Sequence, residues 1–216
     1  MQKKRISPAI IRRLPRYYRY LLTLDKNAVE RVSSKELSVL MDVTASQIRQ
    51  DFNSFGGFGQ QGYGYNVRYL CKQLSAILGF NRSYRAIILG AGNLGRALLN
   101  NFRFETPVFE FVAAFDIAPD VTGSSINGVP VYDISGLEEY IEAHLPDIAV
   151  LTVPQASVFQ LCSRLEKTKI KGIWNFTNLD ITLQNSDIFI ENVHFSDSLM
   201  IVFYQISRKE SEFHQQ

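Results

Sequence analysis

A glycine pattern typical of nucleotide-binding turns lies near the middle of the chain. The apolar run Ala86–Leu89 is followed by Gly90-Ala91-Gly92-Asn93-Leu94-Gly95 and then by a helical stretch. In this strand–turn–helix order the first glycine makes the tight turn, the second lets a pyrophosphate approach the backbone, and the third lets the helix pack on the strand. The N-terminus of the helix then faces the phosphates. We therefore expect these six residues to bind a dinucleotide.

A carboxylate after the next expected strand indicates which dinucleotide this is. Asp116 follows Gly95 by 21 positions. A carboxylate here accepts hydrogen bonds from the adenine-ribose hydroxyls and repels a 2′-phosphate, which favours NADH and NAD+ over NADPH and NADP+. Thr152, Val153 and Pro154 are also expected to bind the cofactor. Two alternatives stay open: a glycine turn that binds nothing, and CoA, because CoA-binding domains share this fold.

Polar side chains on a short helix in the first half of the chain favour contact with DNA. Between Thr44 and Asn53, the residues Ala45, Ile48 and Phe52 recur at positions i, i+3 and i+7 and are expected to face the core. The side chains then expected to point outward are Ser46, Gln47, Arg49, Gln50 and Asn53. Arginine can form two hydrogen bonds with guanine, and glutamine can pair with adenine in the major groove. We expect Thr44 and all of the outward residues up to Gln50 to contact DNA.

Charge is distributed unevenly between the two halves of the chain. Residues 1–85 hold 15 Lys and Arg against 5 Asp and Glu, a balance of +10, and the remainder holds 8 against 16, a balance of −8. On the first expected helix, Arg12 and Arg13 are predicted to contact DNA phosphates. A basic face that meets only water is the alternative. RNA is disfavoured, because no aromatic strand of the RNP type occurs.

Helix signals place this chemistry on a helix-turn-helix. A first helix is expected to open at Ser7-Pro8, and Pro15 is expected to kink or divide it. Capping boxes of Ser33 with Glu36 and of Thr44 with Gln47 are expected to open two further helices across a short turn. Five glycines alternate with Phe and Tyr in the stretch 55–65, which predicts a β-hairpin wing. The residues at its tip that are expected to touch DNA are Gln60, Gln61 and Gly62.

The second half alternates short apolar runs with helices, which predicts a parallel sheet. The expected strands are Ala86–Leu89, Phe111–Phe115, Val129–Tyr132, Ile148–Val153, Ile173–Phe176 and Ile188–Val193. The expected helices are Leu94–Phe102, Gly136–His144, Gln155–Lys167 and Ser196–Arg208. The fold class is thus α/β, a winged-helix domain at residues 1–80 joined to a Rossmann doubly wound parallel sheet at 84–195, with a C-terminal helix and tail at 196–216.

Composition excludes several other classes of protein. No apolar run is long enough to span a bilayer, and no secretion signal follows the basic start of the chain. The two cysteines, Cys71 and Cys162, form no Cys-x-x-Cys pair, which argues against a disulfide framework and against a metal site. A cytoplasmic protein is expected. The three histidines complete no acid–base or nucleophilic set, so binding is favoured over catalysis.

Five motifs, taken together and in this order, make the chain resemble the Rex family of redox-sensing transcriptional repressors. They are residues 7–19, Thr44-Ala-Ser-Gln-Ile-Arg-Gln-Asp51, 55–65, the Gly90–Gly95 turn and Gly172-Ile-Trp-Asn-Phe176. The resemblance implies a homodimer that binds palindromic operator DNA when NADH is low and releases it when NADH is high. It also implies a C-terminal helix swapped between subunits, and Phe195 close to the nicotinamides at the dimer interface.

The chain departs from the family pattern in two places. Many relatives carry a basic residue at the wing tip, where this chain has Gln60-Gln61. In members of the family an Arg, a Tyr and an Asp form a network that distinguishes the oxidised from the reduced cofactor, and the matching positions are Arg19, Asn101 and His194. Only the arginine is kept. The alternative to a repressor is a nucleotide-dependent enzyme, using NAD or CoA, with an accessory basic domain.

Overall fold

The computed structural model describes residues 7–56, 63–104, 106–183 and 187–213. The chain forms two compact units, Met1–Arg82 and Ser83–Gln216. Within the described residues no helix has the length and apolar character needed to cross a membrane. Nor do His, Cys, Asp and Glu side chains of these same residues gather into a group that could hold a metal ion.

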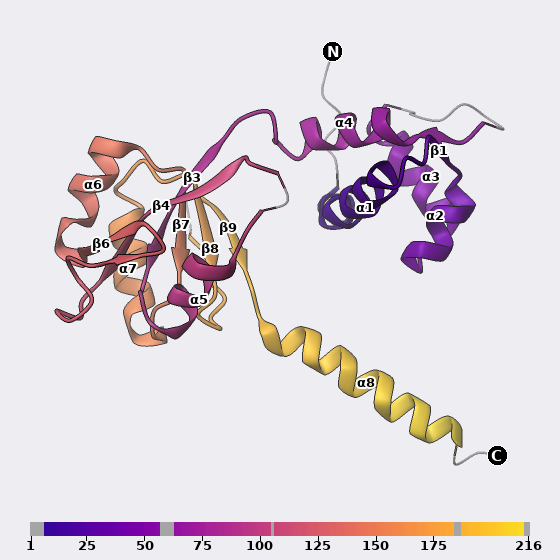
Figure 1. The fold of residues 1–216 in the computed structure, drawn as a ribbon. Coiled ribbons are helices and arrows are strands. Elements are labelled where there is room, and N and C mark those ends of the chain that lie inside the picture. The colour runs from indigo at the N-terminus through magenta and orange to yellow at the C-terminus, as the bar shows by residue number, and fades with distance from the viewer. Residues whose placement is uncertain (1–6, 57–62, 105, 184–186, 214–216) are drawn as a thin grey trace. The chain divides into compact units, whose positions relative to one another are not determined.

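The first unit consists of helices and a short two-stranded ribbon, and the helices supply most of its core. In chain order its elements are α1 (Pro8–Lys26), β1 (Arg31–Val32), α2 (Ser34–Met41), α3 (Ala45–Asn53), β2 (Tyr65–Asn66) and α4 (Val67–Ile77) (Figure 1). β1 and β2 pair antiparallel, and this pairing is not foreseen from the sequence. The predicted tip of the wing, Gln60, Gln61 and Gly62, lies outside the described residues.

Helix α1 begins where the sequence predicts and continues through Pro15. Ser7 accepts a hydrogen bond from the N–H of Ile10 at 3.4 Å, and Pro8 takes the first helical position. Pro15 was predicted to kink or divide this helix, and it does not divide it. Apolar side chains on both sides of the proline share one core and hold the two parts in a single helix: Leu14, Tyr17, Tyr18 and Leu21 are all buried.

The two short helices of the helix-turn-helix start differently. Ser33 and Glu36 form the predicted capping box of α2. At α3 only half of the predicted box is present, because Thr44 accepts from the N–H of Gln47 while the Gln47 side chain bonds Asp51 instead of the cap. Core packing then fixes α3: Phe52 is fully buried, and its ring centre lies 5.1 Å from that of Tyr17 and 5.0 Å from that of Tyr65.

The second unit is built on a seven-stranded sheet with the order β5-β6-β4-β3-β7-β8-β9. The strands are β3 (Tyr84–Leu89), β4 (Phe109–Asp116), β5 (Ser125–Ile126), β6 (Val129–Asp133), β7 (Ile148–Leu151), β8 (Gly172–Asn175) and β9 (Phe189–Asn192). All neighbours pair in parallel except β5, which pairs antiparallel with β6. Without β5, this is the doubly wound order. Successive strands are added to one side of β3 as far as β6, and the chain then returns to add β7, β8 and β9 on the other side of β3.

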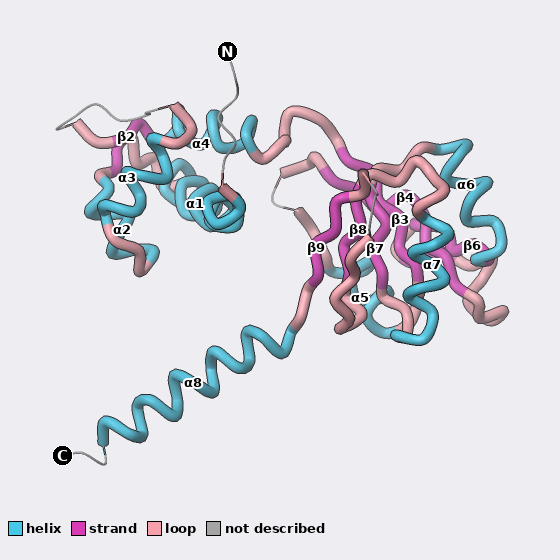
Figure 2. The backbone as a smooth tube through the Cα atoms, turned by 180° about the vertical axis from the view of Figure 1, so that it is seen from behind, coloured by secondary structure: helices cyan, strands magenta, loops and turns pink. Residues whose placement is uncertain are grey.

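Helices cover both faces of this sheet (Figure 2). On one face, α6 (Leu137–His144) and α7 (Val158–Leu165) bury their apolar side chains against Ile87, Phe115 and Leu151. On the other face, α5 (Asn93–Asn101) packs Leu99 against a second apolar cluster. The single-turn helices Ile134–Gly136 and Gln155–Ser157 precede α6 and α7. The Rossmann architecture predicted from sequence is confirmed.

The chain ends in helix α8 (Phe195–Phe213), which is longer than predicted. Its residues from 195 to 211 are exposed in the single chain. Large apolar side chains are among them, namely Leu199, Met200, Ile201, Val202, Phe203, Tyr204 and Ile206.

Candidate functional site

A cavity of about 340 Å³ lies where β3, β4 and β7 end, at the point where the order of the sheet reverses. Ligands of doubly wound sheets bind in the crevice at this point. Six of the residues predicted to bind the cofactor line it: Gly90, Gly92, Asp116, Thr152, Val153 and Pro154. The others predicted in the turn, Ala91, Asn93, Leu94 and Gly95, belong to the same strand–turn–helix segment but do not line the cavity.

The three glycines meet different surroundings. Gly90 has a φ of +101°, and a Cβ there would lie 2.8 Å from the carbonyl oxygen of Thr152. A Cβ on Gly95 would collide with the carbonyl oxygen of Gly90, so the helix can approach the strand only without one. At Gly92, apart from the glycine itself and its two chain neighbours, no atom of the described residues lies within 4 Å of a Cβ position. Two glycines are therefore needed by the fold itself, and the third borders open space in the cavity.

Asp116 is held in place by the backbone around it. Its Oδ2 accepts from the N–H of Ala91 at 2.6 Å, and its Oδ1 accepts from the N–H groups of Ile117 and Ala118 at 2.8 and 2.9 Å. A carboxylate offers about four acceptor positions. These three bonds leave Oδ2 as the oxygen with room for a further donor. Asp116 thus stabilises the glycine turn as well as facing the cavity.

Sequence reasoning missed a charged residue in the cavity wall. Arg164 on α7 lines the cavity and donates from Nε and Nη2 to Glu138 at 2.6 Å each, and from Nη2 to the carbonyl oxygen of Ile134 at 2.7 Å. These hydrogen bonds to Glu138 raise the pKa of Arg164 and lower the pKa of Glu138. No motif marks the pair, because the two residues are 26 positions apart and meet only through the packing of α6 and α7.

Three residues singled out by the resemblance lie elsewhere in the second unit. Phe195 does not line the cavity of its own chain, and its ring centre lies 5.9 Å from that of Phe176. The Nε2 of His194 lies 3.0 Å from Oδ1 of Asp180. Asn101 donates to the carbonyl oxygen of Ala97 at 3.1 Å.

On the first unit, most of the predicted DNA-contacting side chains are accessible. Arg12, Thr44, Ser46, Arg49 and Gln50 are all exposed. Thr44 is the N-terminal cap of α3, and Nη1 of Arg49 donates to the hydroxyl of Ser34 at 3.1 Å.

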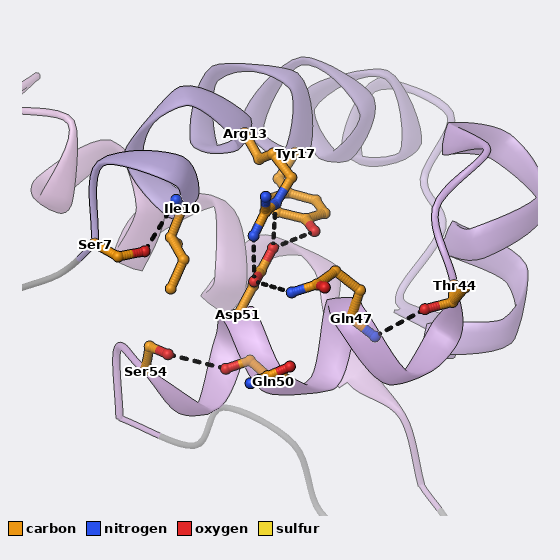
Figure 3. A network of polar contacts seen from close by, with 9 residues as sticks. All are labelled: Ser7, Ile10, Arg13, Tyr17, Thr44, Gln47, Gln50, Asp51 and Ser54. Carbon is orange, nitrogen blue, oxygen red and sulfur yellow. Dashed lines mark hydrogen bonds and ion pairs between the residues drawn. The ribbon is translucent and has the colours of Figure 1, made fainter.

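Two of the predicted contacts are instead engaged inside the unit, around the fully buried Asp51 (Figure 3). Arg13 donates to both of its oxygens, from Nε at 2.7 Å and from Nη2 at 2.8 Å. The hydroxyl of Tyr17 donates at 2.7 Å and Nε2 of Gln47 at 2.8 Å. Arg13 was expected to be free for phosphates, but its guanidinium is held by this carboxylate, which needs donors in the absence of water. Gln47 was expected to point outward; it is half-buried and turns only its amide nitrogen toward Asp51.

Burial alone raises the pKa of the Asp51 carboxyl, but the hydrogen bonds from Arg13, Tyr17 and Gln47 outweigh it and lower the pKa below its ordinary value. Asp51 is therefore a carboxylate at neutral pH. In the same network, burial and then the hydrogen bond to Asp51 raise the pKa of Tyr17.

A helix-turn-helix unit joined to a dinucleotide fold defines a class of transcriptional regulators that respond to a nucleotide. Two family models match the chain, "Putative DNA-binding protein N-terminus" over residues 5–53 and "CoA binding domain" over residues 81–179. Curated relatives named redox-sensing transcriptional repressor Rex are 51% identical over 97% of this chain in Caldanaerobacter subterraneus subsp. tengcongensis and 48% identical over 97% in Clostridium tetani, and the matches cover 94% and 100% of those proteins. The chain belongs to the Rex family of redox-sensing transcriptional repressors.

Solved structures agree with this assignment. The Rex-family repressor RSP in complex with β-NAD+ and operator DNA matches with a TM-score of 0.88 at 48% identity, over 97% of this chain and 96% of that one. RSP in complex with β-NADH matches with a TM-score of 0.89 at 45% identity, over 98% and 99%. The predictions of the family, of its two-part fold and of a regulator in place of an enzyme are confirmed by these relatives.

Proposed function

We propose that this protein is a repressor that binds palindromic operator DNA as a homodimer and is released from it by NADH. The observation that carries the proposal is the cavity at the reversal point of the sheet, where Gly92 borders open space beside the carboxylate of Asp116. The nucleotides named for the solved relatives, NAD+ and NADH, are carried over to this cavity, and their operator DNA to the helix-turn-helix.

The proposed cofactor contacts divide by the part of the dinucleotide they meet. The pyrophosphate lies over Gly92 and the N-terminus of α5, where the helix dipole favours negative charge. The adenine ribose donates to Oδ2 of Asp116, and Thr152, Val153 and Pro154 follow along the cavity. Phe195 contributes apolar surface near the nicotinamide in the assembled dimer.

The proposed DNA contacts come from exposed residues of the first unit. Arg12 binds phosphate, and Thr44, Ser46, Arg49 and Gln50 enter the major groove with the start of α3, as the second helix of such motifs does. Gln60, Gln61 and Gly62 of the wing reach the adjacent groove. Arg13 acts indirectly, by holding α3 on α1.

A second copy of the chain is the proposed partner of α8. Its exposed apolar side chains form a continuous surface that is unfavourable in water. A partner subunit that packs on this surface would bury it. The proposal includes a cytoplasmic location, no bound metal, and working domains at 1–80, 84–195 and 196–216.

A binding titration tests the proposal. The duplex is the one that the wild-type chain enriches from a random library, and its affinity is measured by fluorescence anisotropy without nucleotide and with NADH, NAD+ or NADPH. We expect NADH to lower the affinity at least tenfold and NADPH at the same concentration to leave it within twofold. Operator affinity that NADH leaves unchanged would overturn the proposal. Light scattering is expected to give a dimer for the full chain and a monomer for a chain ending at Val193.

A further inference from the structure

We propose that Gln47 reads an adenine in the operator, and that Asp51 is the positioning residue that fixes the orientation of its amide. The inference rests on the proposed function, since it requires the helix-turn-helix to bind operator DNA. It adds a residue-level assignment: which atoms of Gln47 face the base, and what holds them there.

The buried carboxylate of Asp51 determines which end of the Gln47 amide faces it. Asp51 is fully buried and its pKa is lowered by its hydrogen bonds, so it is a carboxylate that accepts and never donates. Only the NH₂ end of Gln47 can therefore face it, and Nε2 lies 2.8 Å from Oδ1. The carboxylate of Asp51 therefore fixes which of its two amide orientations Gln47 adopts.

The Gln47 amide keeps one N–H and its oxygen free of the bond to Asp51. One N–H of Gln47 is used by Asp51, which leaves the second N–H and Oε1 outside this network. Adenine presents N7 as an acceptor and its N6 amino group as a donor in the major groove, and glutamine pairs with both through one N–H and its oxygen. The atoms left over are the pair that adenine requires.

Gln47 lies near the start of α3, among exposed residues that are proposed to contact DNA. Gln47 is the third residue of α3 and lies between the exposed Ser46 and the exposed Arg49 and Gln50 further along the helix. Residues in the first turns of the second helix of such motifs contact base edges. Gln47 itself is half-buried, so its outer edge can meet DNA while its inner N–H stays on Asp51.

Hydrogen bonds from α1 hold the Asp51 carboxylate in place. Arg13 and Tyr17 come from α1 and bond the carboxylate from above in the view of Figure 3, while Gln47 on α3 bonds it from the side. Four hydrogen bonds from two helices thus converge on one buried group. An amide that is fixed before binding loses less conformational freedom on DNA than a free one.

The experiment measures base preference and not affinity alone. The selected duplex and each single base-pair substitution of one half-site are titrated with wild type, Gln47→Met, Tyr17→Phe and Tyr65→Phe. We expect the wild type to lose about tenfold when one adenine is replaced, which corresponds to a single good glutamine pair. In Gln47→Met this preference should fall below twofold at that position and persist elsewhere.

Tyr17→Phe tests the positioning role. The obvious variant, Asp51→Ala, removes the acceptor of four bonds and can unfold the unit, so Tyr17→Phe is chosen because it removes one bond and keeps the ring on Phe52. Tyr65→Phe is the matched control, since its ring also packs on Phe52 but its hydroxyl is not part of the Asp51 network. Tyr17→Phe should reduce the preference at the Gln47-dependent position about threefold, and Tyr65→Phe should leave it unchanged.

The outcomes separate this inference from the function beneath it. If the wild type binds its operator but Gln47→Met changes no single position more than the others, the adenine assignment is wrong. If Tyr17→Phe weakens every duplex equally, Asp51 stabilises the fold and does not set the amide. A wild type without any preference for an operator over random DNA would overturn both this inference and the proposed function.

Discussion

Two neighbouring arginines of α1 have the same chemistry and opposite surroundings. Arg12 is exposed, whereas Arg13 is only 32% exposed and is bonded through two of its nitrogens to the buried Asp51. From the sequence, both arginines are predicted to contact DNA phosphates from a basic helix. The structure assigns Arg13 to the stability of the unit, because a buried carboxylate without its cation is costly.

Replacing these arginines should therefore give different results. We expect Arg13→Ala to lower the free energy of unfolding by roughly 2–3 kcal/mol, less than for a fully buried pair because part of the guanidinium reaches water. Arg12→Ala should change it by less than about 0.5 kcal/mol and weaken all DNA sequences alike. Urea unfolding of both variants measures the first effect, and salt-dependent DNA titrations of Arg12→Ala measure the second. Equal stability of the two variants would contradict the assignment.

Asp116 supports a second prediction at the scale of single residues. NADH should bind far more tightly than NADPH, because the 2′-phosphate would meet a carboxylate with one oxygen already on Ala91 and the other on Ile117 and Ala118. Asp116→Ala should reduce the difference between the affinities for NADH and NADPH, although it also removes a hydrogen bond that holds the glycine turn. Calorimetry of both nucleotides on the same variant cancels the effect of that loss in the ratio of affinities. Equal affinity of the wild type for the two nucleotides would contradict the carboxylate argument.

At the scale of elements, sequence patterns predict what local chemistry decides. The caps Ser7 and Ser33, the glycine turn and every strand of the sheet except the short β5 follow from signals within a few residues, and the structure has them. What could not be predicted depends on partners far along the chain. The Asp51 network joins residues 34 and 38 positions apart, and β1 pairs with a strand more than 30 residues later. Pro15 does not divide α1, because the burial of apolar side chains on both sides of it outweighs its local cost.

The glycine turn provides a prediction that separates fold from binding. Gly92→Ala places a methyl group where the described residues leave open space, so the melting temperature should change little while NADH affinity falls at least tenfold. Gly95→Ala forces α5 away from the carbonyl of Gly90 and should lower the melting temperature by several degrees. Thermal unfolding with calorimetric NADH binding distinguishes them. A Gly92→Ala variant that binds NADH as tightly as wild type would show that the pyrophosphate lies elsewhere.

At the scale of the whole molecule, regulation of the proposed dimer requires that a nucleotide bind its DNA-competent and DNA-incompetent forms with different affinity. NADH needs only a preference for the incompetent form, and the contact that we propose between Phe195 and the nicotinamide would supply it by favouring the uncharged dihydronicotinamide. A response to NAD+ needs a further interaction. The resemblance to the family implies that its members use an arginine–carboxylate pair for this response. The matching positions in this chain hold Arg19 and His194.

The last prediction is that NAD+ changes the operator affinity of this chain by less than twofold. His194 cannot give an arginine two acceptors, and its Nε2 is already directed at Asp180, 3.0 Å away. Its other nitrogen could accept one bond at most, and protonation would remove that bond and repel the guanidinium. Operator affinity is measured with and without saturating NAD+ in the wild type and in the double variant Asn101→Tyr with His194→Asp. The double variant should gain NAD+ dependence that the wild type lacks. A gain of tenfold or more in the wild type, about 1.4 kcal/mol of coupling, would mean that other residues supply the missing pair.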